Sequence, residues 1–347
     1  MKTFKLLFTI VAVMMAFPGN ATSIKDNPIP VHRPLVEEYA GTWCGWCVRG
    51  LAGMELLDET FGDNYVGVVY HYNDAMATIA VNKFPNTITG FPSEFINRTQ
   101  SVDPLNGTGN TSGGIVNAVS EIASEATIAD LDISAQWTSE DKTDIAVNVS
   151  SYFTVDDNSG NYAIEVMLIA NDLYGSGSGW NQTNKYSGDS DYAQDPYLSV
   201  FVNSPSVITG YHFNDIIVGT SGVISGSLPI NIVAYDLYSY DHTFTISRLP
   251  KPSLIQNKDK LLVVAIIYDK TNKIVINANK APISNFITSL PGDVNDDNGV
   301  NVGDIAAIID YLLDNSAPIN FTNADLNGDG IVNVADLSDL IDLILSN

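Results

Sequence analysis

Two cysteines lie three positions apart in this chain, and their spacing indicates redox chemistry. Cys44 and Cys47 are the only cysteines among 347 residues. A disulfide between them closes a loop of four residues, which stabilises a fold by only about 2 kcal/mol in the chain-entropy model. An exported chain held together by disulfides would carry more cysteines at wider separations. The pair therefore favours thiol–disulfide exchange over a structural role.

The flanking segments place the pair where a predicted strand ends and a predicted helix begins. Residues 35–39 have strand character, and apolar residues recur at helical spacing over 51–61. Free backbone N–H groups and the positive end of the helix dipole stabilise a thiolate at Cys44. Cys47 lies one turn further on, close enough to attack a mixed disulfide. Cys44 is therefore the predicted nucleophile and Cys47 the resolving thiol.

Zinc is the main alternative ligand for a Cys-x-x-Cys pair. A zinc site needs two further ligands, and the chain has no second Cys-x-x-Cys motif. The four histidines are scattered, at positions 32, 71, 212 and 242. The sequence therefore favours the redox interpretation.

The residues around the dithiol resemble the thioredoxin family, with a strand, Trp-Cys-Gly-Trp-Cys at 43–47, a helix and a later proline before a strand. The resemblance implies that Phe91-Pro92 occupies the cis-proline position, where Pro92 lies beside the dithiol and backbone is presented to a bound substrate chain. It also implies that Glu38, six residues before Cys44, is a buried acid that assists proton transfer. Glu37 faces the other side of the strand, and the pattern leaves open which of the two carboxyls is buried.

The two residues between the cysteines depart from the family. They are Gly-Trp, where thioredoxins have Gly-Pro and stronger oxidants have Gly-His or Pro-His. The missing histidine removes one source of thiolate stabilisation. The sequence therefore leaves open whether the pair reduces or oxidises its client.

Two twelve-residue segments near the C-terminus have the ligand pattern of calcium-binding loops. Residues 293–304 carry side-chain oxygens at loop positions 1, 3, 5, 9 and 12, and residues 325–336 repeat the scheme. Position 7 supplies a backbone carbonyl, and Gly330 permits a sharp turn. The predicted ligands are Asp293, Asn295, Asp297, Gly299, Asn301, Asp304, Asp325, Asn327, Asp329, Ile331, Asn333 and Asp336. An acidic, solvated tail is the simpler alternative, but it does not explain a duplicated pattern.

Each loop precedes an amphipathic helix, and position 12 is Asp where EF-hands have Glu. This arrangement resembles type I dockerins over essentially all of residues 292–347. The first loop departs by having Asn298 where Gly is usual, which Asn tolerates because it adopts positive φ readily. The resemblance implies two calcium ions and a cohesin-type partner of the kind found in polysaccharide-degrading assemblies.

The chain as a whole reads as a multidomain protein. Residues 22–126 alternate strands with helices, including a short helix expected over 75–84, and predict an α/β thioredoxin-like domain. Residues 127–290 contain seven or more short strand-like runs, among them 230–235 and 244–249, and predict an all-β sandwich. Residues 174–197 are expected to form a long loop. Residues 291–347 predict a small α-helical, dockerin-like, calcium-binding module.

The N-terminus indicates export. Lysines at positions 2 and 5 precede an apolar run over 6–17 and a small-residue cleavage site, so residues 1–21 predict a signal peptide. An uncleaved anchor is the alternative, but the run is short for a membrane span. The net charge of −24 argues against binding nucleic acid, and nothing later in the sequence predicts a direct membrane span.

The order of these parts resembles bacterial envelope proteins of the outer-membrane-protein-28-related group. The resemblance rests on residues 38–47, 180–184 and 264–270. We expect an exported thiol–disulfide oxidoreductase, in the periplasm, at the outer-membrane surface or outside the cell, that acts on client protein thiols or disulfides and is tethered through its tail. The alternative is a non-catalytic surface protein that uses the β-rich region and the tail for assembly. The sequence names neither client nor docking partner.

Overall fold

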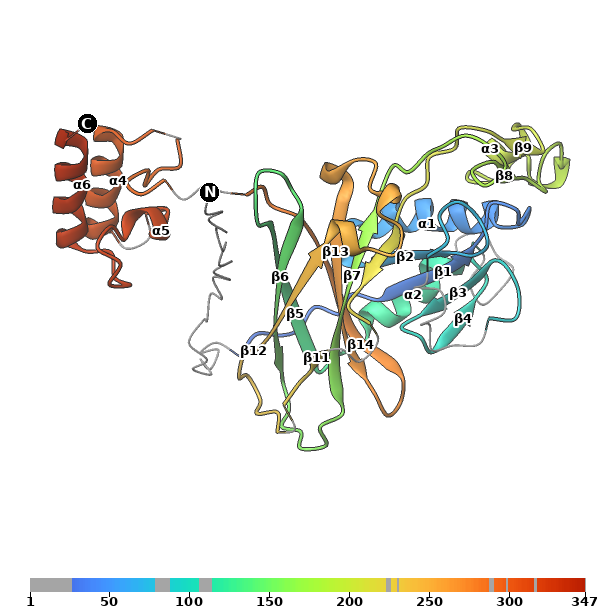
Figure 1. Cartoon of the computed structure of the whole chain (residues 1–347). Coiled ribbons are helices and arrows are strands. Elements are labelled where there is room, and N and C mark those ends of the chain that lie inside the picture. The colour runs from blue at the N-terminus through green and yellow to red at the C-terminus, as the bar shows by residue number, and fades with distance from the viewer. Residues whose placement is uncertain are drawn as a thin grey trace, which may run out of the picture. The chain divides into compact units, whose positions relative to one another are not determined.

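The computed structural model describes residues 27–78, 88–105, 114–222, 226–229, 231–286, 290–297, 299–314 and 317–346 (Figure 1). The predicted signal peptide, residues 1–21, lies outside this range. The chain divides into two compact units, residues 1–285 and residues 286–347. No helix within the described ranges is long and apolar enough to cross a membrane.

A nine-stranded mixed sheet is the main feature of the first unit (Figure 1). Its strands run in the order β14-β13-β7-β10-β2-β1-β3-β4, and β11 pairs with β7. Strand β2 pairs in parallel with β1 and β10, and the other neighbours are antiparallel. The strands are β1 (Leu35–Ala40), β2 (Val66–His71), β3 (Ser93–Ile96), β4 (Gln100–Val102), β7 (Tyr162–Ala170), β10 (Ile216–Thr220), β11 (Gly226–Ser227), β13 (Leu261–Asp269) and β14 (Ile274–Pro282).

The sheet is buried on both faces. All six residues of β1 are buried, and side chains alternate along a strand, so β1 contributes to two cores. Val36 and Ala40 lie in one core, while Leu35 and Tyr39 lie in the other. Helix α1 (Val48–Phe61) joins β1 to β2 and packs against helix α2 (Gly114–Ser124). Strand β1, which leads into the cysteine loop, is thus packed on both of its faces.

A second sheet has three antiparallel strands in the order β12-β6-β5. These are β5 (Ala129–Trp137), β6 (Asp144–Phe153) and β12 (Tyr238–Thr245). Alternate residues of β6 are buried, which is the pattern of a strand with one covered face. Strand β5 lies against β13 and β14 of the larger sheet.

The larger sheet runs through the domain boundary expected at 126/127. Strand β10, from the expected sandwich, pairs with β2 of the expected α/β domain, with Ile216 opposite Val69. The sequence of residues 216–220 does not indicate which strand they pair with, because pairing between distant strands is a property of the tertiary structure. A division into an α/β domain and a β-sandwich domain therefore stays a proposal, and it would cut one continuous sheet.

Several expected elements differ in the structure. Residues 231–235 form turns and an isolated bridge instead of a strand. Strand β12 ends at Thr245, and a 3-10 turn, Ile246–Arg248, follows it. Residues 75–78 are not helical, and the remainder of the helix expected over 75–84 lies outside the described residues. The expected loop 174–197 contains β8 (Gln182–Thr183), which pairs with β9 (Val207–Ile208) and precedes α3 (Ser199–Val202).

The second unit contains three helices, α4 (Val302–Leu313), α5 (Phe321–Ala324) and α6 (Val334–Ser346). Helices α4 and α6 pack together around a small apolar core. The buried core residues are Val294, Ile308, Ala324, Val332 and Leu340. Each long helix follows one of the two acidic loops, as the sequence predicts.

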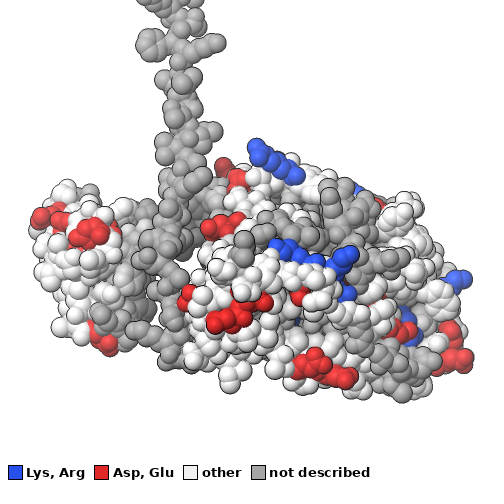
Figure 2. All heavy atoms as spheres, turned by 90° about the horizontal axis from the view of Figure 1, so that it is seen from below, with Lys and Arg blue, Asp and Glu red and all other residues white. Residues whose placement is uncertain are grey.

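Acidic side chains form several scattered patches on the face shown in Figure 2, and basic side chains cover less of it. This distribution agrees with 40 acidic and 16 Lys or Arg residues in the sequence.

Candidate redox site and calcium-binding loops

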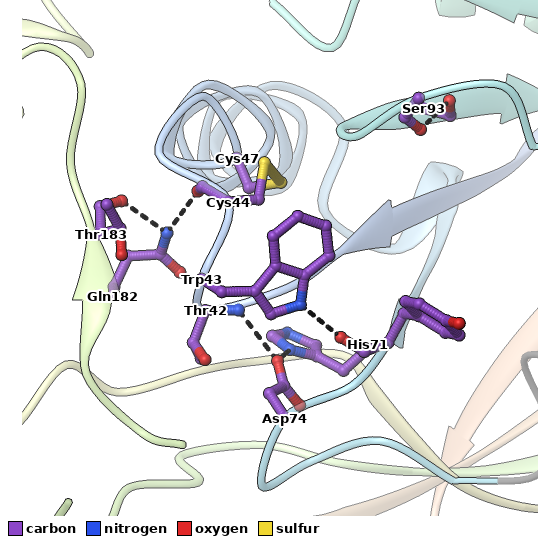
Figure 3. The surroundings of a disulfide bond; sticks show 11 residues. Thr42, Trp43, Cys44, Cys47, His71, Asp74, Ser93, Gln182 and Thr183 are labelled. Carbon is purple, nitrogen blue, oxygen red and sulfur yellow. Dashed lines mark hydrogen bonds and ion pairs between the residues drawn. A yellow bond between two sulfur atoms is a disulfide. The ribbon is translucent and has the colours of Figure 1, made fainter. Parts of the chain in front are cut away.

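Cys44 and Cys47 form a disulfide at the start of α1, with Cα atoms 5.4 Å apart (Figure 3). Cys47 immediately precedes the first helical residue, Val48. The positive end of the helix dipole therefore lies at the disulfide, where it stabilises a thiolate formed on reduction. Both cysteines are largely buried, with exposures of 5% for Cys44 and 1% for Cys47. The predicted position of the pair between strand and helix is thus present in the fold.

A short segment from the second half of the chain runs along the cysteine loop. The Thr183 N–H donates to the Thr42 carbonyl at 2.7 Å, and the Lys185 N–H donates to the Gly45 carbonyl at 3.0 Å. The side-chain Nε2 of the buried Gln182 donates to the Cys44 carbonyl at 3.0 Å (Figure 3). Sequence analysis expected a loop here and did not predict these contacts. Its only signal was the Trp-Asn-Gln-Thr-Asn motif at 180–184.

A buried histidine–aspartate pair fixes the other side of the cysteine loop. Asp74 Oδ2 lies 2.5 Å from His71 Nδ1 and accepts a hydrogen bond from the Thr42 N–H at 2.9 Å. Burial acts to raise the pKa of Asp74, but its bonds to His71 and to backbone N–H groups lower that pKa below its usual value. A charged acceptor thus holds the backbone two residues before Cys44. Sequence analysis singled out neither residue for this role.

Aromatic side chains surround the disulfide. Trp43 and Trp46 are about half exposed, at 47% and 52%. The Trp43 ring packs edge-on against the Phe91 ring, with the ring centres 5.2 Å apart, and Trp43 Nε1 donates to the Tyr72 carbonyl at 2.7 Å. Trp46 packs edge-on against Tyr186 at 5.5 Å. The exposed side chains that flank the cysteines are therefore aromatic, and each packs against a further ring.

The Phe91-Pro92 peptide bond is cis. Strand β3 begins at the next residue, Ser93, which lies opposite Tyr39 of β1. The contact between Phe91 and Trp43 brings this segment alongside the cysteine loop. The role of Pro92 in presenting backbone to a client stays a prediction.

The sequence left open whether Glu37 or Glu38 is buried, and in the structure both are. Glu37 Oε1 accepts hydrogen bonds from Arg98 Nη2 and from the Tyr70 hydroxyl, both at 2.9 Å. Glu38 points to the opposite face, and neither of its oxygens has a hydrogen-bond partner in the part of the chain that the structure describes. Burial, with a smaller contribution from the charge of Asp215, raises the pKa of Glu38 to about 8. Glu38 can thus carry a proton at neutral pH.

The first acidic loop places its predicted ligands around one backbone turn. The Asp297 N–H donates to Asp293 Oδ1 and Asn295 Oδ1, each at 3.0 Å, so both oxygens point into the loop. The carbonyl of Gly299 faces Asn301 Nδ2 at 3.4 Å. The fully buried Asp304 at position 12 accepts from the Val294 and Asn301 N–H groups, at 2.7 and 2.9 Å. Asn298 lies outside the described residues.

The second loop repeats this geometry. The Asp329 N–H donates to Asp325 Oδ1 at 3.1 Å and Asn327 Oδ1 at 2.9 Å. Asn333 Nδ2 donates to the Ile331 carbonyl at 3.2 Å. Asp336 is fully buried and accepts from the backbone at three positions. Gly330 has a φ of +82°, as the expected sharp turn requires.

The oxygen-rich donor sets of both loops fit a hard cation such as calcium. In the described ranges, no three His, Cys, Asp or Glu side chains by themselves come together as a metal site. The predicted ligands are instead a mixture of carboxylate, amide and carbonyl oxygens, in which the side-chain oxygens also accept from the loop backbone and the two carbonyls accept from Asn side chains. That mixture is what the calcium-loop pattern predicts.

Comparison with protein families identifies the second unit. Residues 291–345 match the type I dockerin domain. Type I dockerin domains bind calcium, in agreement with the donor sets of the two loops. A solved chain of the CaDoc0917–CaCohA2 complex is 41% identical over 17% of this chain and all of that chain, with a TM-score of 0.16.

The larger part of the chain is similar in fold to HBP35 of Porphyromonas gingivalis. That structure is 13% identical, with a TM-score of 0.51, over 75% of this chain and 79% of the other. A domain of the outer membrane lipoprotein Omp28 from Porphyromonas gingivalis is 14% identical over 46% of this chain and 92% of that domain, with a TM-score of 0.27. The comparison with curated proteins gives no match. The chain thus combines a mainly β-sheet unit, similar in fold to HBP35 of Porphyromonas gingivalis, with a C-terminal type I dockerin domain.

Proposed function

We propose that this protein is an exported thiol–disulfide oxidoreductase of the cell envelope or cell surface, tethered through its dockerin domain. The observation that carries the proposal is the Cys44–Cys47 disulfide at the start of α1. A disulfide closing four residues contributes little stability. Its position at a helix N-terminus beside exposed aromatic side chains supports a chemical role instead.

The fold around the dithiol supports a thioredoxin-like assignment. Strand β1, helix α1 and strand β2 form a β-α-β unit with parallel strands, and β3, β4 and α2 follow. The cis Phe91-Pro92 bond precedes β3. These are the elements that the resemblance implied.

The exchange reaction uses the two sulfurs in sequence. In the reducing direction, the Cys44 thiolate attacks a client disulfide, forms a mixed disulfide and releases one client thiolate. Cys47 then loses its proton, attacks Cys44 Sγ and forms the Cys44–Cys47 disulfide, and the second client sulfur leaves as a thiolate. The client disulfide is reduced by two electrons and the protein dithiol is oxidised by two. The reverse sequence transfers a disulfide to a client dithiol.

Turnover of insulin disulfides with dithiothreitol, and oxidation of a reduced test peptide, measure the two directions. Wild-type protein is expected to exceed a Cys44→Ser variant in at least one of them. Ser replaces the sulfur with little change in volume, so it serves as a matched control. Activity equal to that of Cys44→Ser in both assays contradicts the proposal.

The dockerin domain supports a cohesin-type partner. Its two loops and two packed helices form a compact unit of their own, and the 41% identical chain was solved in a complex with CaCohA2. We propose two calcium ions, one in each loop. Titration of the metal-free protein with calcium, followed by calorimetry, is expected to give a stoichiometry of two. A stoichiometry of one contradicts the assignment of one ion to each loop.

A non-catalytic assembly protein is the second candidate. The observation that favours it is the burial of both cysteines, which restricts access of a client sulfur to the disulfide. A Cys47→Ser variant separates the candidates, because it traps the mixed disulfide with a client. Cohesin binding without any trapped client supports the assembly role.

A further inference from the structure

Two carboxyls lie side by side in the interior of the first unit. Glu38 on β1 and Glu94 on β3 are directly opposite each other in antiparallel register. Directly opposed residues point to the same face of a sheet, with Cβ atoms about 5 Å apart. Both glutamates are fully buried, and across the described ranges neither carboxyl has a hydrogen-bond partner. Stability alone does not explain two unpaired buried acids, because each burial is costly.

The pair lies against the helical turn that begins at the dithiol. A Cβ on Gly50 would come within 1.7 Å of Glu38 Oε1, so the carboxyl fills the space that this glycine leaves open. The Gly50 N–H in turn donates to the Cys47 carbonyl at 3.0 Å. Glu38 thus contacts the first turn of α1, three residues beyond the resolving cysteine.

The groups that face this pair do not neutralise it. The nearby ionisable groups are Asp58, Tyr65, Asp103, Tyr211 and Asp215, with the cations Arg49 and Lys280. Arg49 Nε is bound to Asp103 Oδ1 at 2.8 Å, and Lys280 Nζ lies 4.9 Å from the centre of the Tyr65 ring. Both cations are therefore engaged elsewhere.

Burial and like charge act together on both carboxyls. Burial, followed by the charge of Asp215, raises the pKa of Glu38 to about 8. Burial, followed by the charges of Glu38 and Asp103, raises the pKa of Glu94 well above its usual value. Two carboxyls this close do not both ionise readily, so they titrate in two coupled steps.

We propose that Glu38 and Glu94 form one proton-sharing pair that serves the dithiol, with Glu94 as a positioning residue that acts through Glu38. The proposal rests on the redox activity proposed above and adds a second residue to the single acid that the resemblance implied. As the pH rises toward 8 the pair loses its first proton, and the member that has ionised then accepts the thiol proton of Cys47 when Cys47 resolves a mixed disulfide. The Cys47 thiolate then attacks Cys44 Sγ, and the client sulfur leaves as a thiolate that takes a proton from water.

The test is the pH dependence of the reduction potential of the disulfide in the full-length, calcium-loaded protein, equilibrated with dithiothreitol buffers from pH 5 to pH 10. The wild-type curve is expected to change slope where the pair titrates. Glu38→Gln is expected to abolish this break. Glu94→Gln keeps the shape but removes the acid that shares the proton of the singly ionised pair, so it is expected to move the break at least about half a pH unit higher. Glu121→Gln, an exposed glutamate on α2, is the control.

Infrared spectroscopy gives a second measurement that does not depend on the redox couple. A protonated-carboxyl band at pH 7 is expected in the wild type and is expected to weaken in Glu38→Gln and Glu94→Gln alike. A break at the same pH in Glu94→Gln and wild type, or no break in the wild type, overturns the inference. The potential is measured without a client, so inactivity in both the insulin and the peptide-oxidation assays refutes the proposed function and leaves this test intact.

Discussion

Replacing Glu38 with glutamine is expected to stabilise the first unit at neutral pH. The pKa of this carboxyl is about 8 in the folded protein, against 4.5 as its ordinary value. Between these values the folded state binds a proton that the unfolded state has released. The free energy of unfolding therefore falls as pH rises from 4.5 and levels off above 8.

The size of the effect follows from the width of this pH window. One pKa unit corresponds to about 1.4 kcal/mol, so the wild type loses about 3 kcal/mol between pH 4.5 and pH 7. Glutamine carries no charge at any of these values and escapes the loss. Glu38→Gln is thus expected to raise the free energy of unfolding by about 3 kcal/mol at pH 7 and to change it little at pH 4.5.

Urea denaturation followed by tryptophan fluorescence measures this difference. All four tryptophans, at positions 43, 46, 137 and 180, belong to the first unit, so the signal does not report on the dockerin domain. Glu121→Gln controls for the loss of an exposed carboxyl. Equal stability of Glu38→Gln and wild type at pH 7 would refute the reasoning, and so would a gap of the same size at pH 4.5.

Three further substitutions probe packing, charge and the calcium loops. Gly50→Ala is expected to lower the free energy of unfolding by about 1–3 kcal/mol in urea titrations, because the new methyl group overlaps the Glu38 carboxyl. Arg98→Met is expected to lower it by about 3–5 kcal/mol in the same assay, because two buried carboxylates, one of them on Glu165, lose their counter-charge. Asp336→Ala is expected to lower the midpoint of thermal helix loss in the dockerin domain with and without calcium, because three backbone N–H groups lose their acceptor.

Each of these substitutions has a control and a contradicting result. Gly62→Ala is the control for Gly50→Ala, since a Cβ at position 62 meets no atom within 4 Å, although the positive φ of Gly62 adds strain of its own. Arg248→Met controls for loss of a cation with no ion pair in the described ranges. Asp339→Ala, on α6 outside the loop, is the control for Asp336→Ala. Unchanged stability in Gly50→Ala or Arg98→Met, or an unchanged melting midpoint of the dockerin domain in Asp336→Ala, would contradict the corresponding argument.

Local spacing in the sequence determined the two chemical features of the protein. A cysteine pair three residues apart predicts its own position at the start of α1, because strand character before it and helical periodicity after it are both readable over a few residues. The dockerin loops are equally local, since twelve consecutive residues supply all of each ligand set. The family comparison confirmed the dockerin domain, and the cysteines lie where the periodicity placed them.

Only the tertiary structure decided what surrounds the dithiol. The sequence placed Glu38 near Cys44, but its pairing with Glu94 depends on the register of β1 against β3. The contact of Gln182 with Cys44 joins residues 138 positions apart, and the pairing of β10 with β2 joins strands that the sequence assigned to separate domains. Strand register and long-range pairing arise from packing energies summed over a whole core, and no local pattern encodes them. The distant residues that contact the cysteine loop were therefore not readable from the sequence, although the cysteine pair itself was.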